Sequence, residues 1–169
     1  MTKALDILRR HWLVAALLAS AAMLAIAHAF ETFGHLAPCT LCLRQREVYW
    51  TAMTVAAAAL VATRLPGGPR WRRPGCWALA LVFFAGAMLA AYHAGAEWKW
   101  WPGPQTCAST GASASAADMA ALLRGAKVAP PACDVAPWVF LGLSMAGWNV
   151  LISLKLAVFS VLAARRVDV

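Results

Sequence analysis

The sequence predicts an all-α membrane protein, a bundle of four transmembrane helices with two outer loops. Its hydrophobic fraction is 62% and its charged fraction 13%, whereas soluble domains carry about 25% charged residues. The charges are also clustered, which leaves long uncharged stretches between them, and the basic residues flank one side of the resulting spans. We therefore expect a single integral membrane domain over residues 1–169.

Each span is predicted from an apolar stretch long enough to cross the hydrocarbon, which takes about 20 helical residues. The fourth stretch contains Lys155, whose charge is costly inside a membrane and so suggests either a function or a side chain that reaches back to the inner interface. We favour the second explanation for Lys155. The four spans are expected at roughly 12–30, 46–63, 76–95 and 143–164.

The basic residues predict the orientation. Lys and Arg in short segments mark the cytoplasmic side of a membrane protein, so we expect both termini and the loop 64–73 inside, and residues 31–45 and 96–137 outside. The net charge of +8 then reflects topology and excludes nucleic acid as the expected partner. The residues behind this assignment are Lys3, Arg9, Arg10, Arg64, Arg70, Arg72, Arg73, Arg165 and Arg166.

The first apolar stretch also has features of a cleavable signal peptide. Basic residues precede it, and Ala27-His28-Ala29 resembles a cleavage site. The stretch is longer than the usual apolar region of roughly 7–15 residues. We therefore expect it to be retained as a membrane span.

Four cysteines fall in the expected outer loops: Cys39 and Cys42 in the first, Cys107 and Cys133 in the second. Such pairs serve as metal ligands, structural disulfides or redox centres. An oxidising outer compartment disfavours a zinc site of four thiolates, so we expect no metal. A Cys-x-x-Cys disulfide closes a very small loop and stabilises little, which favours reactivity; a bond between Cys107 and Cys133 would close a larger loop and could be structural.

The residues around the first pair favour reactive thiols. Pro38 suits the first turn of a helix, which would place Cys39 at the positive end of the helix dipole and favour its thiolate. Arg46 follows Cys42 by four residues and so lies on the same helical face. Its guanidinium could stabilise a thiolate or a ligand carbonyl oxygen; the alternative is an anchor to lipid headgroups. Arg44 points off that face and fits the anchor role better.

Three further predictions concern single residues and the second loop. His93, at the outer end of the third span, fits either a contact with a ligand held beside Cys42 or a water-bonded interfacial residue. Haem is disfavoured because its two histidine ligands would have to lie deep in facing spans. Cys76 opens the third span on the opposite side and is expected to be a buried or interfacial thiol. Residues 108–117 are expected to be a flexible linker. Residues 118–127 could form one or two helical turns, either on the membrane surface or as a frayed helix within the loop.

At this point the sequence resembles the DsbB family of membrane quinone reductases. The resemblance rests on Pro38-Cys39-Thr40-Leu41-Cys42 followed by Arg46, on Cys107 and Cys133, and on the segment Trp138-Val139-Phe140-Leu141-Gly142-Leu143-Ser144-Met145 before Trp148. It spans most of the chain, with the elements in the same order. Departures are Lys155, the Ala/Ser-rich loop 108–117 and Arg44-Gln45, which affect loop detail and partner choice.

The resemblance implies an enzyme of a bacterial inner membrane that reoxidises a periplasmic DsbA-like thiol oxidase and passes the electrons to ubiquinone or menaquinone. It implies redox disulfides Cys39–Cys42 and Cys107–Cys133. The partner would form a mixed disulfide with Cys107, released Cys133 would attack Cys39, and Cys42 would reduce a quinone held by Arg46, with His93 as a second contact. The alternative is a membrane scaffold with two structural disulfides.

Overall fold

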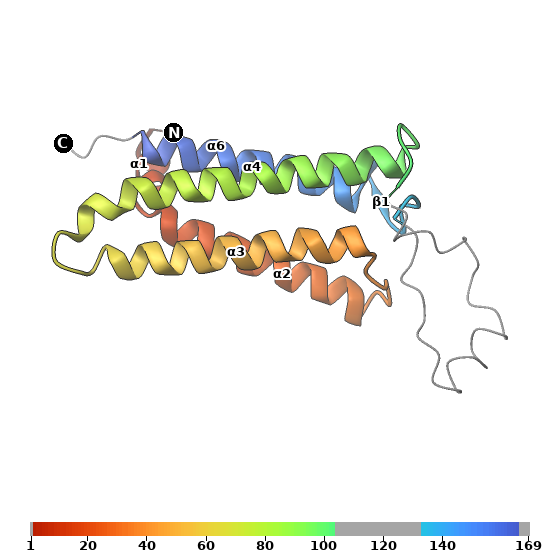
Figure 1. Ribbon diagram of the computed structural model, residues 1–169, viewed down its shortest axis with the longest axis horizontal. Coiled ribbons are helices and arrows are strands. Elements are labelled where there is room, and N and C mark those ends of the chain that lie inside the picture. Colours follow the sequence, from red (N-terminus) through yellow and green to blue (C-terminus); the bar gives the residue numbers. More distant parts are fainter. Residues whose placement is uncertain (1, 104–132, 166–169) are drawn as a thin grey trace.

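Helices make up most of the protein. The computed structural model (Figure 1) describes residues 2–103 and 133–165. The short helix α1 (Thr2–Arg10) leads into α2, and the 3-10 helix η1 (Gly68–Trp71) leads into α4. The four long helices are α2 (Trp12–Thr32), α3 (Thr40–Ala62), α4 (Arg72–Glu97) and α6 (Met145–Ala164).

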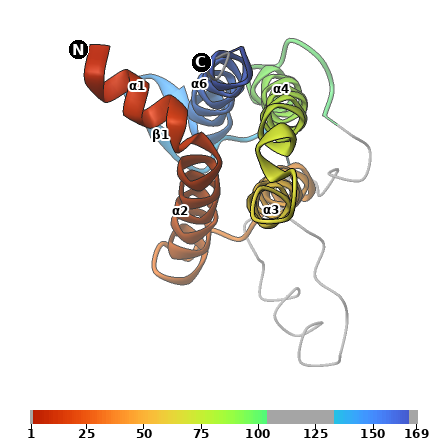
Figure 2. The same cartoon turned by 90° about the vertical axis from the view of Figure 1, so that its left-hand side faces the viewer.

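The long helices lie side by side as a bundle. Helix α4 packs along α6, α3 packs against both α2 and α4, and the end view in Figure 2 shows the four axes around a common centre. Helix α1, the α3–α4 turn and the end of α6 lie at one end of the bundle, while the α2–α3 connection and the end of α4 lie at the other (Figure 1). This places the predicted inner and outer segments at opposite ends.

Three of the described helices have the length and apolar composition needed to cross a membrane: Trp12–Thr32, the segment Gly68–Glu97 that joins η1 to α4, and Met145–Ala164. Helix α3 is not one of them, because its first two turns contain Arg44, Arg46 and Glu47. At 1.5 Å per residue its 23 residues still extend about 35 Å. A fourth crossing therefore remains a prediction. Lys155 is exposed on α6.

The start of α3 differs from the prediction. The helix begins at Thr40 and not at residue 46, so most of the expected loop 31–45 is helical and only 33–39 connects α2 to α3. Cys39 is the N-cap, with extended backbone angles φ −76° and ψ 170°. Pro38 thus precedes the cap and does not lie in the first turn as expected. The correction strengthens the case for Cys39 at a helix N-terminus.

The segment before α6 forms a hairpin that the sequence did not predict. Strands β1 (Val139–Phe140) and β2 (Leu143–Ser144) pair antiparallel around Leu141 and Gly142, whose φ values are +51° and +78°. Positive φ at both central residues is typical of two-residue hairpin turns and is costly for leucine. Because the hairpin uses residues 143 and 144, α6 begins at Met145, with the Ser144 side chain as its cap.

Small residues allow the helices to approach closely. Ala52, Ala56 and Ala90 are fully buried, and a Cβ atom added at Gly86 would lie 2.8 Å from Val48 Cγ1. Small side chains at helix crossings are the usual means of packing in membranes, where no hydrophobic effect drives helices together. Polar contacts add to the packing: the Trp12 indole N–H donates to Ser160 Oγ at 2.8 Å.

We expect Cys39 to be accessible from the outer side after reduction and Cys76 to be protected. Cys39 precedes α3 at one end of the bundle, whereas Cys76 lies just after the start of α4 at the other. The measurement is labelling of single-cysteine variants in intact cells with a membrane-impermeant thiol reagent, with permeabilised cells as the control. Labelling of Cys76 with protection of Cys39 would invert the orientation.

Candidate functional site

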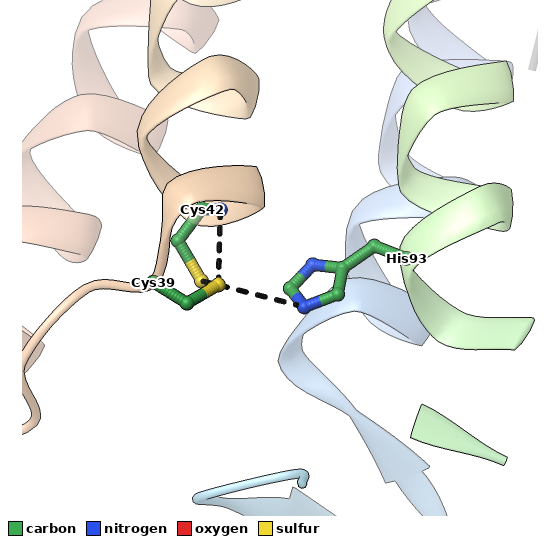
Figure 3. A group of neighbouring side chains, drawn as sticks. All are labelled: Cys39, Cys42 and His93. Carbon is green, nitrogen blue, oxygen red and sulfur yellow. Dashed lines mark hydrogen bonds between the residues drawn. The ribbon is translucent and has the colours of Figure 1, made fainter. Parts of the chain in front are cut away.

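Cys39 and Cys42 lie together at the N-terminus of α3 (Figure 3). Their Sγ atoms are 2.8 Å apart, and both residues carry thiols in this structure. The backbone N–H of Cys42 donates to Cys39 Sγ at 3.2 Å, so the cap is a sulfur atom. Cys39 is only 5% exposed, whereas Cys42 is half-buried.

His93 reaches this pair from α4, as Figure 3 shows. Its Nε2 atom lies 3.6 Å from Cys39 Sγ. The pKa of the Cys39 thiol is lowered, chiefly by the hydrogen bond with Cys42 and further by His93, although burial acts in the opposite direction. The sequence allowed two interpretations of His93, a contact in the site or a water-bonded residue at the interface. The structure buries His93 in the site.

Cys133 is brought to the same place from the segment that precedes the β1–β2 hairpin. It is 1% exposed and forms one buried cluster with Cys39 and Leu41. Its Sγ atom lies 3.3 Å from Thr40 Oγ1, and it is disulfide-bonded. The expected partner, Cys107, lies outside the described residues, as do the linker 108–117 and the helix 118–127.

The residue after Cys133 ties this segment to the end of α4. Asp134 pairs with Lys99 through an exposed contact, and the hydrogen bond from Lys99 lowers the pKa of the Asp134 carboxyl. An exposed pair contributes little to stability. Its effect is to position the chain that enters the site.

A network of buried polar side chains runs inward from His93. Gln45 Nε2 lies 2.8 Å from His93 Nδ1, and Gln45 Oε1 accepts from Asn149 Nδ2. Asn149 Oδ1 in turn accepts from the hydroxyl groups of Tyr49 and Ser153. Sequence reasoning missed this network. Its signal was the four-residue spacing of Gln45 and Tyr49, and of Asn149 and Ser153, which puts each pair on one helix face.

Asn149→Leu should destabilise the bundle. It removes the hydrogen bonds to Gln45 and Tyr49. Tyr49 keeps its hydrogen bond with Ser153, but the buried Oε1 atom of Gln45 loses its donor, which costs roughly 1–3 kcal/mol. This cost exceeds the contribution of an average interhelical hydrogen bond in a membrane, about 0.6 kcal/mol. The measurement is the free energy of unfolding in detergent micelles. Thr54→Ala, at an exposed position on α3, is the control and should change stability by less than about 0.5 kcal/mol. Equal effects would show that the network is energetically neutral.

Glu97 is an acidic residue at the site that the sequence did not single out. Its side chain is 2% exposed, and its Oε1 atom lies 3.8 Å from His93 Nε2. The Ser144 hydroxyl donates to its other oxygen. The sequence placed the span end at residue 95; α4 continues to Glu97 and so brings this carboxylate beside His93.

A cavity of about 340 Å³ opens beside Cys39 and Cys42, which we call the inner pair. Cys42, Arg46 and His93 all line it. The rest of its wall is mostly apolar and aromatic, and it comes from α2, α3, α6 and the hairpin. The apolar and aromatic lining residues include Met23, Ile26, Phe30, Trp138, Phe140, Trp148 and Ile152.

Arg46 is held at the wall of this cavity. Its guanidinium pairs with Glu31 of α2 at 2.5 Å and donates to the carbonyl oxygen of Ala27 at 3.1 Å. Its side chain is 15% exposed, whereas that of Arg44, paired with Glu47, is 68% exposed. Within the described part of the chain no hydrogen bond joins Arg46 to Cys42, so stabilisation of a Cys42 thiolate by Arg46 stays a prediction.

Cys76 lies outside this site. It is fully buried in the apolar core with Leu79 and Phe83. Of the two expected positions for the Cys76 thiol, buried or interfacial, the structure shows the buried one.

Cys76→Ser should lower stability but leave thiol–disulfide exchange at the outer cysteines intact. Burying a hydroxyl in place of a thiol costs about 1–3 kcal/mol, while the site lies several helical turns away. The measurements are unfolding in detergent and the exchange rate with a small dithiol, with Cys76→Ala as the matched control. Loss of exchange by a folded Cys76→Ser protein would show that the redox set is misassigned.

The arrangement combines a dithiol with a lowered thiol pKa, a second cysteine buried against it and an apolar cavity with polar groups in its wall. Such a site can exchange disulfides by thiolate attack and can hold an organic acceptor next to sulfur. The ligand atoms of Cys39, Cys42 and His93 also lie within 4.8 Å of one another, a spacing that suits a metal ion.

Comparison with known proteins is consistent with this chemistry. The family model described as "Disulfide bond formation protein DsbB" matches residues 9–163. No curated protein and no solved structure matches the chain. Because the family match covers most of the sequence and includes every cysteine, the chain belongs to the DsbB family of membrane proteins that form disulfide bonds.

Proposed function

We propose that the protein is a dithiol:quinone oxidoreductase that reoxidises a periplasmic DsbA-like thiol oxidase. The observation that carries the proposal is the position of Cys42: it is half of the inner pair and also lines a largely apolar cavity. Sulfur that can exchange disulfides therefore meets the space in which a membrane-soluble acceptor fits.

The residues around the cavity suit a quinone. Its volume of about 340 Å³ lies within the usual range of roughly 300–1,000 Å³ for small-molecule sites. Apolar and aromatic walls would hold the ring and the isoprenoid tail, and Arg46 and His93 offer N–H donors to the carbonyl oxygens. When bound, the quinone supplies an acceptor for two electrons and two protons.

Cys107 and Cys133, which we call the outer pair, would receive electrons first. A thiolate of the partner attacks Cys107 of the Cys107–Cys133 disulfide, and Cys133 leaves as a thiolate. Cys133 then attacks Cys39 of an oxidised inner pair, so a Cys133–Cys39 bond forms and Cys42 leaves as a thiolate. The burial of Cys133 against Cys39 and Leu41 supports this step, since the attacking and attacked residues already share one cluster.

The remaining steps restore the outer disulfide. The partner's second thiolate attacks the partner sulfur that is bonded to Cys107. This forms the partner's disulfide and frees Cys107 as a thiolate. Released Cys107 attacks Cys133, which re-forms Cys107–Cys133 and frees Cys39 as a thiolate. The inner pair then holds both electrons. The Cys42 N–H and His93 stabilise negative charge on Cys39, so the dithiol form is kept ready for oxidation.

The proposed location is the bacterial inner membrane with both termini in the cytoplasm. The basic residues of the α3–α4 turn and of α1 lie at the bundle end opposite the cysteine site, as the rule for positive inner segments requires. In this orientation α3 is the fourth crossing. The partner then meets Cys107 and Cys133 in the periplasm.

If the protein were a scaffold with structural disulfides, its disulfides would resist mild reductants. In our proposal mild dithiol treatment reduces both pairs, and added ubiquinone or menaquinone restores the disulfides within the time of the assay. The test is trapping of thiols by an alkylating reagent, read by mass, before and after quinone. Pairs that resist mild reductant, or that quinone fails to reoxidise, would support the scaffold.

A further inference from the structure

Three potential metal-binding side chains converge where α3 begins and α4 ends, and the carboxylate of Glu97 lies next to one of them. The Sγ atoms of Cys39 and Cys42 and the Nε2 atom of His93 all lie within 4.8 Å of one another. The Oε1 atom of Glu97 lies 3.8 Å from the same Nε2 atom. Two thiolates, an imidazole and a carboxylate are all established zinc ligands, and four of them complete a tetrahedral site.

The distances suit a tetrahedral ion. Zinc bonds of about 2.0–2.3 Å place neighbouring ligand atoms roughly 3.3–3.8 Å apart. The separations of Cys39 Sγ and Glu97 Oε1 from His93 Nε2, 3.6 and 3.8 Å, already match this spacing. Glu97 is not one of the three residues whose ligand atoms are all mutually close, so its carboxylate must shift toward the two sulfur atoms to become the fourth ligand. The Sγ–Sγ distance of 2.8 Å must open by about 1 Å, which a rotation of the half-buried Cys42 side chain provides.

The surroundings also suit an ion. Cys39 and His93 are 5% and 3% exposed, so few water molecules compete for the ligands. Three of the four side chains, namely Cys42, His93 and Glu97, line the cavity, which gives an ion an entry path. The dithiol is a ligand pair only when reduced, because a disulfide has no thiolate to offer.

Two neighbouring residues can hold the ligands in place. Ser144 donates to the carboxylate oxygen of Glu97 that does not face His93. His93 bound through Nε2 would carry its proton on Nδ1, which lies 2.8 Å from Gln45. Gln45 accepts a hydrogen bond from this N–H when the side-chain amides of Gln45 and Asn149 are both turned by a half rotation, because the hydrogen bond between the two amides then survives in the reverse direction. Hydrogen bonds of this kind fix the orientation of ligands around zinc.

We propose that the reduced inner pair is a zinc site and that the bound ion stops turnover, with Cys39, Cys42, His93 and Glu97 as the ligands. Binding moves no electrons: each protonated thiol loses its proton to water as its sulfur bonds to the ion. The metal site itself stands on the geometry alone. Its inhibitory effect rests on the proposed function. The ion would keep the two thiolates from being oxidised, and it would occupy space beside the quinone cavity.

The site differs from the four-cysteine zinc site that the sequence suggested and disfavoured. It needs neither Cys107 nor Cys133, and it forms only in the reduced intermediate, so an oxidising compartment does not prevent it. The ion should act most strongly when the acceptor is scarce, because the dithiol then persists.

Cadmium, whose thiolate complexes absorb in the ultraviolet, is the direct probe. The protein would be a variant with Cys76, Cys107 and Cys133 replaced by serine, purified in detergent and titrated with Cd²⁺ in reduced and oxidised forms. We expect one ion per chain in the reduced form, protection of both thiols from alkylation, displacement by Zn²⁺, and no such absorbance in the oxidised form. Absence of binding to a folded, reduced protein, or loss of binding caused by replacing Cys107 and Cys133, would overturn the proposal.

Two variants test the other ligands. His93→Ala and Glu97→Gln should each weaken Cd²⁺ binding by at least roughly tenfold, because a ligand is lost while both thiolates remain. His28→Ala is the matched control, since His28 bonds to its own helix at the Leu24 carbonyl, and should bind as the parent does. Parent-like affinity in both test variants would reduce the site to a simple dithiol chelate and contradict the assignment.

Turnover of the wild-type protein separates this proposal from the proposed function. We expect Zn²⁺ to inhibit quinone reduction and a chelator to restore it. Ion binding by a protein that never reduces quinone would retain the metal site and contradict the proposed function. Quinone reduction that saturating Zn²⁺ leaves unchanged would retain the proposed function and contradict the inhibitory role.

Discussion

Cys42→Ala should abolish quinone reduction and still form a mixed disulfide with the partner, whereas Cys107→Ala should abolish the mixed disulfide itself. The expected losses are complete because each variant removes a sulfur atom that must form or break a bond. In the proposed relay Cys42, which lines the cavity, reduces the quinone and Cys107 is attacked by the partner, so the two positions act at opposite ends. Non-reducing gels with the reduced partner, together with quinone absorbance, measure both steps.

The control for this pair is Cys76→Ser, which removes a cysteine from the core without touching the relay and should retain both steps. Partner capture lost equally in Cys42→Ala and Cys107→Ala would show that the proposed order of electron flow is wrong. Capture retained in Cys107→Ala would move the point of partner attack to another cysteine.

Arg46→Ala should lower the efficiency of quinone use by roughly ten- to a hundredfold, since a hydrogen bond to a charged group contributes about 1.5–3 kcal/mol. The pairing of its guanidinium with Glu31 and the Ala27 carbonyl fixes it at the cavity wall, so its position is built by two helices. Arg46→Lys keeps the charge but loses the planar fork and should be impaired less. Steady-state kinetics at varied quinone concentration provide the measurement.

Arg44→Ala is the matched control, because Arg44 lies on the same helix and pairs with Glu47 at an exposed position. It should leave quinone kinetics within about twofold of the parent, as expected of a surface ion pair. Exchange with the partner should survive in Arg46→Ala, because Cys133 lies against Thr40 and Cys39 and the proposed thiol exchange steps do not use Arg46. Unchanged quinone kinetics in Arg46→Ala would return this residue to the role of a headgroup anchor.

Much of the fold could be predicted because charge and hydropathy decide membrane structure. The apolar stretches around residues 12–30, 76–95 and 143–164 all proved to be membrane-length helices. The helix ends were harder. The outer loop was expected to extend to residue 45, yet the Cys39 cap starts α3 at Thr40. The hairpin at Leu141-Gly142 depends on positive φ values that a leucine gives no reason to expect.

The site was predictable only in part. Cys39, Cys42 and Arg46 share one short segment, so their chemistry could be argued from spacing along a helix. For His93 the sequence left two interpretations open, and Glu97 was not singled out, because the approach of both residues to Cys39 depends on how α4 packs beside α3. The same holds for Gln45 and Asn149, which come from different helices and meet only in the packed bundle.

In the proposed function electrons pass from a protein dithiol to a quinone through this chain. The most direct measurement is quinone absorbance in a mixture of the purified protein, a reduced DsbA-like partner and ubiquinone or menaquinone. Our account predicts one quinone reduced per partner dithiol oxidised, over many turnovers, and no reaction when Cys42 is alanine. Partner oxidation without quinone loss, or quinone loss that persists in Cys42→Ala, would contradict it.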